Sequence, residues 1–251
     1  MKISVVIIAK NAQDQIKECL SSVSFANEVL VVDSGSTDNT IEIAKGMGAK
    51  ILGCKTADFS EMRNIGLEKA AGEWVLYIDT DEVISPELEA DIKLKISSNE
   101  PNIAAYKVKR KNFYLGKHEW PKIEKLERLF KRNFLKGWYG SLHESPIIKG
   151  EIGELEGFLL HYTHRNLTLM LAKTIEWSKV EAQLRFKANH PKMSWWRFPR
   201  VMFTAFFDSY VKQGGWKVGT AGLVESIYQS FSMFVTYARL WEMQAKKDKK
   251  L

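Results

Sequence analysis

The sequence predicts an α/β fold in which a mixed, mainly parallel β-sheet is flanked by helices and followed by a helical appendage. Three observations lead to this prediction. Short apolar segments alternate with helix-like segments over the first hundred residues, as in a parallel sheet covered on both faces. Residues 103–132 then change to short alternating runs, which indicate antiparallel strands added to the sheet. Beyond Asn166 the apolar residues recur at helical spacing, so we predict a boundary near 165 and two domains, 1–165 and 166–251.

Each predicted element has a local signal. Aliphatic runs predict the strands, and turn residues such as those of 34–38 open the helices. In chain order we predict a strand at 3–9, a helix at 13–23, a strand at 28–32, a helix from the 34–38 turn through 45, a strand at 49–52, a helix at 61–70, a strand from 74 that ends at Asp79, and a helix at 87–96. In the appendage, one helix carries an apolar stripe formed by Leu223, Ile227, Phe231, Phe234, Ala238 and Trp241.

The composition is that of an ordinary globular protein. A chain of 251 residues with 45% hydrophobic residues can bury a sizeable core. Cys19 and Cys54 are far apart, which suggests neither a disulfide framework nor a cysteine metal site and favours a reducing cytosol. The apolar start is too short for a signal peptide and is interpreted as the first strand. No apolar run approaches the roughly 18 residues expected of a membrane-spanning helix.

The net charge of +7 is concentrated near the C-terminus. Residues 185–251 contain 12 Lys/Arg and 4 Asp/Glu, whereas residues 1–184 contain 25 and 26. The same region is rich in aromatic residues, and this mixture suits an anionic membrane surface. Nucleic acid is the competing partner for a basic aromatic surface, but the aromatic residues stand at helical spacing beside aliphatic ones, so we expect no nucleic-acid binding. The alternative to membrane binding is that this helical tail packs on its own domain.

Three carboxylates, Asp79, Asp81 and Glu82, end the apolar segment that begins at Trp74. They fall in a strand-to-helix turn, where α/β folds bind ligands. Two aspartates at i and i+2 can direct oxygens toward a common point, which suits a hard divalent cation that also takes phosphate oxygens as ligands. The alternative is an acidic turn in which Asp81 or Ser85 merely caps the next helix.

A second carboxylate, Asp33, ends an earlier strand and precedes the glycine-containing turn 34–38. An aspartate there can accept hydrogen bonds from a nucleobase or ribose, while N–H groups at the helix start favour phosphate. The alternative is a plain turn with Asp38 as N-cap. No GxGxxG motif follows the first strand, which disfavours a dinucleotide fold, and there is no Walker loop.

Taken together, four segments in this order resemble glycosyltransferase family 2, the nucleotide-sugar transferases with a GT-A fold. The segments are Ile3 to Asn11, Val32 to Asp38, Arg63-Asn64-Ile65-Gly66, and Trp74 to Glu82. The resemblance implies that Asp33 contacts the uracil or ribose of a UDP-sugar, and that Asn11 and Arg63 line the nucleotide pocket. It implies that Asp79 and Asp81 are the DxD pair, which holds Mn²⁺ or Mg²⁺ as a Lewis acid for the departing diphosphate.

An inverting transferase also needs a base for the acceptor hydroxyl, and our candidate is Glu144. It follows His143 in the turn-rich segment 138–146, and related transferases take their base from an acidic residue of this region. The alternative is that His143 and Glu144 form a solvated loop pair. Asp81 and Glu82 are weaker candidates, because a metal ligand is a poor base.

Other residues are candidates for the same site or have an alternative role. Family members often carry an arginine near the position of Arg128, which could reach the diphosphate; the alternative is an outward residue on an alternating strand. His161 and His164 suggest a metal at first sight, but without a third ligand we interpret them as bracing a helix start. Trp120 and Trp138 could stack on a sugar, yet core packing is the better expectation.

The C-terminal part, 199–240, resembles the bacterial lipopolysaccharide inner-core β-1,4-glucosyltransferase subgroup, although 216–218 depart from the more acidic sequence expected there. The resemblance implies a cytoplasmic, metal-dependent, inverting transferase that moves glucose from UDP-glucose onto a lipid-linked saccharide and docks peripherally on the inner leaflet. A polyprenyl phosphate or a protein side chain is the alternative acceptor. A non-catalytic sugar-nucleotide or membrane-binding module is the alternative class, and the intact Asp79, Asp81 and Glu144 argue against it.

Overall fold

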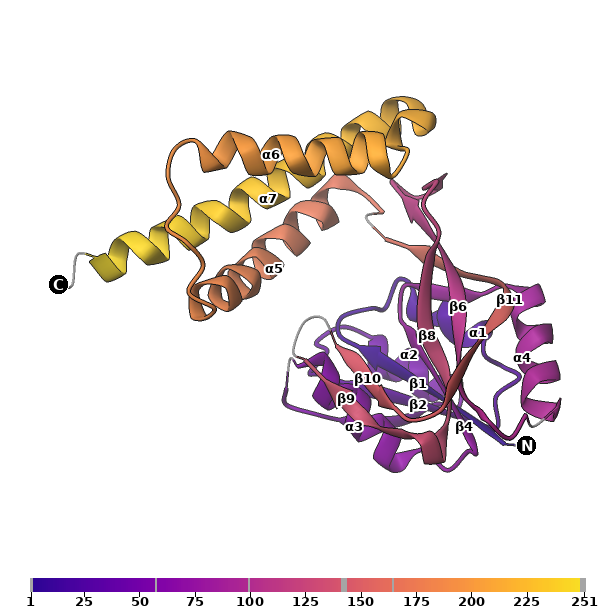
Figure 1. Cartoon of the computed structure of the whole chain (residues 1–251). Coiled ribbons are helices and arrows are strands. Elements are labelled where there is room, and N and C mark those ends of the chain that lie inside the picture. Colours follow the sequence, from indigo (N-terminus) through magenta and orange to yellow (C-terminus); the bar gives the residue numbers. More distant parts are fainter. Residues whose placement is uncertain (1, 57, 99, 141–143, 164, 249–251) are drawn as a thin grey trace. The chain divides into compact units, whose positions relative to one another are not determined.

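The computed structural model describes residues 2–56, 58–98, 100–140, 144–163 and 165–248, and these divide into two compact units (Figure 1). The first unit comprises Met1–Lys111 and Glu124–His161. The second comprises Asn112–Ile123 and Tyr162–Leu251. The division into a catalytic domain, 1–165, and a C-terminal helical domain, 166–251, stays a prediction.

The sheet of the first unit begins with parallel strands in the order β3-β2-β1-β4: β3 (Lys50–Gly53), β2 (Glu28–Asp33), β1 (Ile3–Ala9) and β4 (Trp74–Asp79). The order continues with β8 (Glu124–Lys131), β6 (Ile103–Tyr114), β11 (Glu151–Tyr162) and β5 (Glu82–Ile84), and β7 (His118–Glu119) pairs with β6. The pairs β4–β8, β8–β6 and β11–β5 are antiparallel. The predicted α/β fold with added antiparallel strands is therefore confirmed.

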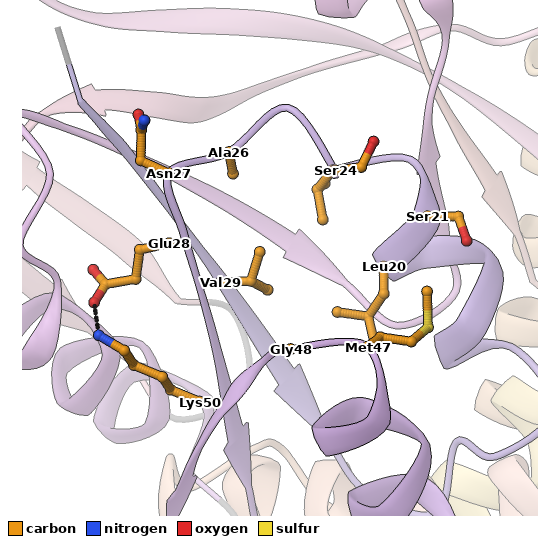
Figure 2. A pocket seen from close by; sticks show the side chains of 11 residues that line it. Leu20, Ser21, Ser24, Ala26, Asn27, Glu28, Val29, Met47, Gly48 and Lys50 are labelled. Carbon is orange, nitrogen blue, oxygen red and sulfur yellow. Dashed lines mark hydrogen bonds and ion pairs between the residues drawn. The ribbon is translucent and has the colours of Figure 1, made fainter.

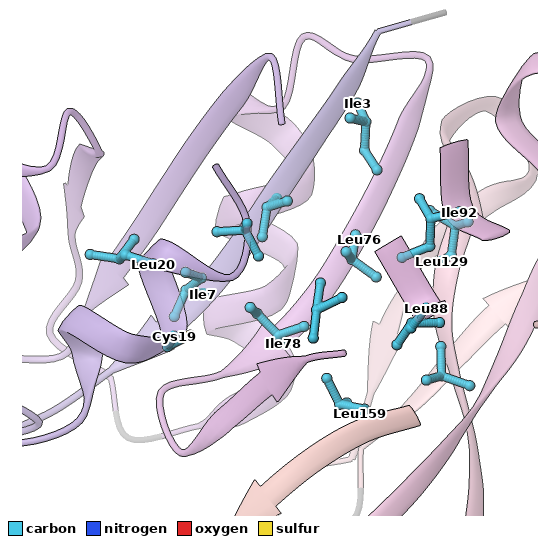
Figure 3. Close-up of a cluster of buried hydrophobic side chains, with 14 of the residues drawn as sticks. Ile3, Ile7, Cys19, Leu20, Leu76, Ile78, Leu88, Ile92, Leu129 and Leu159 are labelled. Carbon is cyan, nitrogen blue, oxygen red and sulfur yellow. The ribbon is translucent and has the colours of Figure 1, made fainter. Parts of the chain in front are cut away.

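Helices cover both faces of this sheet because β1 is apolar on both sides. Ile3, Val5 and Ile7 face a core shared with α1 (Ile16–Ser21), α2 (Thr40–Gly46) and α4 (Pro86–Ser98); Figure 3 shows part of this cluster. Val6 and Ile8 face a second core, shared with α3 (Phe59–Lys69). A strand buried on both faces reads as a continuous apolar run, which is why the sequence predicted β1 so clearly.

A short antiparallel ribbon lies on the α3 side. It pairs β9 (Leu135–Tyr139) with β10 (Ser145–Ile148), after the 3₁₀ turn η1 (Arg132–Phe134). Trp138 belongs to the second core, as expected for core packing. The side-chain amide of Asn64 on α3 fixes the ribbon by donating to the carbonyl of Trp138 (3.0 Å) and accepting from its N–H (2.8 Å). His143 lies outside the described residues.

The second unit is mainly helical. It contains α5 (Leu167–Lys187), α6 (Arg197–Phe207), the π-helical turn η2 (Asp208–Lys212), the 3₁₀ turn η3 (Gly215–Val218) and α7 (Gly219–Asp248). Ala182, Met193, Tyr237 and Leu240 form its apolar core. The predicted stripe on α7 is not this core, because Ile227, Phe231 and Trp241 are exposed while Tyr228 and Tyr237 are buried. Within the described residues, no helix is long and apolar enough to cross a membrane.

Candidate active site

Asp33 and Asp79 lie at the same end of the parallel sheet, on the two strands that neighbour β1. Asp33 pairs with Ala9 at the end of β2, and Asp79 pairs with Ile8 at the end of β4, so the aspartates flank the end of β1. The chain leaves β1 toward β2 on one side and returns to β4 on the other, which makes this edge the topological switch point of the sheet. Open α/β sheets bind their ligands there.

Asp33 and Asn11 join the two loops on the β2 side of this edge. The Asp33 carboxylate accepts from the N–H groups of Gly35 (2.9 Å) and Ser36 (3.0 Å). Asn11 accepts from the N–H of Thr37 (2.8 Å) and adopts a positive φ of 48°, which asparagine tolerates better than most residues. These hydrogen bonds hold the two loops together, and the nucleotide contacts of Asp33 and Asn11 stay a prediction.

Asp79 is held between two buried arginines. Nη2 of Arg63 donates to its Oδ1 (3.0 Å), and Nη2 of Arg128 donates to its Oδ2 (2.9 Å). Burial alone would raise the pKa of Asp79, but the positive charges of Arg128 and Arg63 outweigh burial and hold that pKa well below its ordinary value. Arg128 therefore points into the site instead of outward, and Asp79 is ionised at neutral pH.

Arg63 also holds the candidate base. Its Nε donates to Oε1 of Glu144 (2.9 Å), and its Nη2 lies 2.8 Å from the same oxygen as an ion pair. The guanidinium lies over the rings of Trp138 (5.0 Å) and Tyr77 (5.6 Å), which cover it, and the side chain is only 2% exposed. One buried cation therefore connects Asp79 with Glu144, although the two carboxylates come from distant parts of the chain.

Glu82, which had no assigned role, lies beneath this cluster and is fully buried. One of its oxygens accepts from Arg110 (2.9 Å) and Arg128 (3.0 Å), and the other accepts from the N–H of Asp79 (2.9 Å). Arg110 in turn pairs with Glu124. Burying this acid is tolerated because arginines surround it, and its position fixes both the backbone and the partner of Asp79.

The structure brings His161, which the sequence predicts to brace a helix start, next to Asp81. His161 Nε2 lies 3.3 Å from Asp81 Oδ2. The contact arises because β11 pairs antiparallel with β5, placing His161 opposite Glu82. Only the pairing of two strands about eighty residues apart reveals it. A histidine at the end of an alternating strand, in a chain with an acidic DxD-like turn, was the available signal.

The donor set of Asp81 and His161 fits a divalent cation that takes its other ligands from a substrate. Within the part of the chain that the structure describes, no three His, Cys, Asp or Glu side chains form a metal-binding group. Protein sites for Mg²⁺ commonly supply one or two carboxylates and leave the remaining positions to phosphate oxygens and water. Both oxygens of Asp79 already accept from arginines, so its role as a metal ligand stays a prediction.

Two donor atoms beside the acids have no partner. Nη1 of Arg63 and Nε of Arg128 are buried without a hydrogen bond to any described residue. An unpaired buried donor costs free energy, so such atoms mark places where a bound group or water completes the structure. The carboxylates therefore accept hydrogen bonds from only some of the N–H groups of these two arginines.

A pocket of about 580 Å³ lies away from this cluster (Figure 2). It is lined by the end of α1, the loop before β2, and the residues between α2 and β3, and an ion pair joins Glu28 to Lys50 (2.8 Å) at one side. It stands at the start of β2, opposite the end that carries Asp33. None of the predicted site residues lines it.

Comparison with known proteins identifies the family. The model of glycosyl transferase family 2 matches residues 4–149, more than half of the chain. The chain belongs to glycosyl transferase family 2. It is therefore a nucleotide-sugar glycosyltransferase. The matched residues include the candidate site residues Asn11, Asp33, Arg63, Asp79, Asp81, Glu82 and Glu144.

Relatives extend over nearly the whole chain. An uncharacterized glycosyltransferase of Rickettsia typhi is 29% identical, covering 98% of this chain and 88% of that protein. The lipopolysaccharide core biosynthesis glycosyltransferase LpsC of Rhizobium meliloti is 24% identical, covering 98% of this chain and 94% of that protein. A crystal structure of S. aureus TarS 1–349 in complex with UDP-GlcNAc gives a TM-score of 0.49 at 15% identity, covering 98% of this chain and 92% of that chain.

Proposed function

We propose that this family 2 enzyme transfers glucose from UDP-glucose, with inversion, to a saccharide of a lipid-linked acceptor such as the lipopolysaccharide inner core. The observation that carries the proposal is the cluster at the switch point, where Asp79 and Glu144 contact Arg63, Asp79 also contacts Arg128, and both arginines keep an unpaired buried N–H group. The name of the LpsC relative supports a saccharide of the lipopolysaccharide core as acceptor.

In the proposed donor complex, Asp33 and Asn11 hold the uridine from the β2 side. Asp79, fixed by Arg63 and Arg128, binds the sugar end of the donor, and the spare donors of the two arginines point to the negatively charged diphosphate. Asp81 and His161 would hold Mn²⁺ or Mg²⁺, which when bound compensates the charge of the leaving diphosphate.

Glu144 is the proposed base. The acceptor oxygen forms its bond to the anomeric carbon while the bond from that carbon to the diphosphate oxygen breaks, and the electron pair leaves with UDP. The hydroxyl proton passes to a carboxylate oxygen of Glu144. Arg63 binds Oε1 of this carboxylate, and Oε2 is the oxygen proposed to take the proton.

The two predicted domains divide this work in the proposal. Residues 1–165 bind the donor and carry the catalytic residues, and residues 166–251 bring the enzyme to its acceptor at the cytoplasmic face of the plasma membrane. The excess of positive charge in 185–251 supports this assignment, because the inner leaflet is anionic.

Release of UDP tests the proposal. The purified protein, given UDP-glucose, Mn²⁺ and lipopolysaccharide acceptors truncated at successive core sugars, should release UDP in proportion to glucosylated product. Asp81→Asn and His161→Gln should each lower the rate and raise the Mn²⁺ concentration needed for half-maximal rate. Glu144→Gln should keep donor binding and lose transfer. If no UDP-sugar yields UDP with any acceptor, the proposed transfer reaction is wrong. If product forms only on a polyprenyl phosphate or a peptide, the proposed saccharide acceptor is wrong.

A further inference from the structure

The two residues before α6, the helix itself and the turn η2 after it present an apolar, mainly aromatic face to solvent. This face, here called the α6 outer face, consists of Trp195, Trp196, Phe203, Phe207 and Val211, all exposed. From Trp196 onward its members recur at intervals of seven, four and four residues, so they share one side of the helix. Trp195 is 83% exposed and Phe203 is 67% exposed, and Phe203 stacks on Phe207 at a centroid distance of 6.0 Å.

The opposite side of α6 is also apolar, but it has a partner. Phe198 packs against Phe234 of α7 at a centroid distance of 5.9 Å, and the carbonyl of Met202 accepts a hydrogen bond from Ser230 of α7 (2.9 Å). The α6 outer face therefore stays exposed when α6 packs against α7. A soluble protein rarely leaves so many large apolar side chains contiguous and exposed without an interaction that covers them.

Basic residues accompany the α6 outer face along the chain. Residues 192–217 contain Lys192, Arg197, Arg200, Lys212 and Lys217, with Asp208 as the acidic residue. Asp208 forms an ion pair with Lys212 (3.7 Å) and accepts a hydrogen bond from Gln213 (2.7 Å). The guanidinium groups of Arg197 and Arg200 lie 5.1 and 6.0 Å from the ring of Trp196. Two of the basic groups thus lie beside an aromatic ring of the α6 outer face.

We infer that the α6 outer face inserts into the headgroup region of an anionic phospholipid bilayer, with α6 parallel to the membrane plane. Tryptophan and phenylalanine favour the boundary between headgroups and acyl chains, and flanking arginine and lysine attract anionic lipid while their stems reach back to the headgroups. The cations near the α6 outer face favour an anionic membrane as its partner. An apolar face without cations would suit a protein partner equally well. The inference deepens the proposed function, and rests on it for the identity of the membrane-bound acceptor.

Binding of the full chain to vesicles tests the inference without any donor or acceptor. We compare vesicles of phosphatidylcholine alone with vesicles that contain about 30% phosphatidylglycerol, by co-sedimentation. The double variant F203S/F207S should bind the anionic vesicles at least roughly tenfold more weakly. The matched control is Leu94→Ser on α4, where a 64% exposed leucine is removed from the first unit; its binding should not change. The double variant R197Q/R200Q should lose affinity for the anionic vesicles, whereas K17Q/K45Q, with the same loss of charge in the first unit, should not.

Circular dichroism and thermal melting confirm that each variant is folded. Unchanged vesicle binding by folded F203S/F207S overturns the inference. If the same variant also changes from dimer to monomer in sedimentation equilibrium, the α6 outer face contacts a second copy of the chain instead of a membrane. UDP release is measured separately: its absence in the wild type refutes the proposed function and leaves the vesicle result standing.

Discussion

At the scale of single residues, the site depends on one cation that serves two carboxylates. Arg63 binds both Asp79 and Glu144, the proposed base, and the aromatic rings of Trp138 and Tyr77 keep it from solvent. Its planar guanidinium can donate in several directions at once, which the single ammonium group of lysine cannot do in this geometry. The identity of this residue, and not only its charge, should therefore matter for catalysis.

We predict that Arg63→Lys lowers kcat by roughly 100-fold while changing the KM for UDP-glucose much less, because lysine preserves the charge near Asp79 but releases Glu144. Steady-state kinetics on folded protein measure the two constants. Arg132→Lys replaces an exposed arginine of η1 and is the matched control. Equal losses in kcat and in donor affinity would instead assign Arg63 to donor binding alone.

Asp79 gives a prediction about pH. Because its pKa is lowered in the folded protein, it binds fewer protons there than in the unfolded chain. Its stabilising effect is complete above the ordinary aspartate pKa of about 3.9 and is lost as the pH falls through the folded value. Asp79→Asn should therefore lower the melting temperature at pH 7 and progressively less below about pH 4. Asp14→Asn, at an exposed loop position, is the control. A difference from wild type that grows toward acid pH would contradict this account.

At the scale of elements, the packing of α3 on β1 sets the position of Arg63 and Asn64. Gly66 makes this close approach possible, since a Cβ atom there would lie 2.3 Å from Cγ1 of Val6. The glycine of the Arg63-Asn64-Ile65-Gly66 segment thus explains the spacing of that motif: one turn before it, the helix presents the arginine and the asparagine. The helix cannot shift outward without moving both side chains away from their partners.

We predict that Gly66→Ala destabilises the protein by about 2 kcal/mol, because overpacking in the core outweighs the helix propensity gained. Gly46→Ala, near the end of α2, is the matched control: its Cβ would meet open space, so the change should be neutral or slightly stabilising. Denaturant unfolding measures both. The smaller side chain in Val6→Ala should restore part of the stability of Gly66→Ala, and the absence of any such rescue would argue against the clash.

The sequence indicated some elements of the site far better than others. Asp33 and Asp79 could be placed at one edge because parallel strands bring their carboxyl ends together. His161 and Arg110 could not, because antiparallel pairings place them in the site, and a register shift of one residue would turn each side chain to the other face. The contact between Arg63 and Glu144 joins positions 81 residues apart, and it needs the β9–β10 ribbon, which an apparently turn-rich segment did not reveal.

At the scale of the whole molecule, positive charge is segregated along the chain. Residues 1–184 are close to neutral, while residues 185–251 carry the excess of positive charge together with the α6 outer face. Such a distribution would contribute little to a soluble transferase that met its acceptor in solution. It suits an enzyme whose donor is soluble and whose acceptor is held in an anionic membrane, since the two substrates then reach different parts of the chain.

This segregation predicts different responses of binding and donor chemistry to salt. Raising NaCl from about 50 to about 500 mM shortens the Debye length severalfold and should weaken binding to phosphatidylglycerol vesicles by roughly tenfold or more. The slow release of UDP from UDP-glucose by water should change much less, because Arg63 and Arg128 are buried and their ion pairs are poorly screened. Co-sedimentation and UDP release, measured in the same salt series, compare the two. In R197Q/R200Q the salt dependence of vesicle binding should become shallower while that of UDP release stays as in the wild type; equal salt dependence of vesicle binding in both proteins would show that the cations beside the α6 outer face do not contact the lipid.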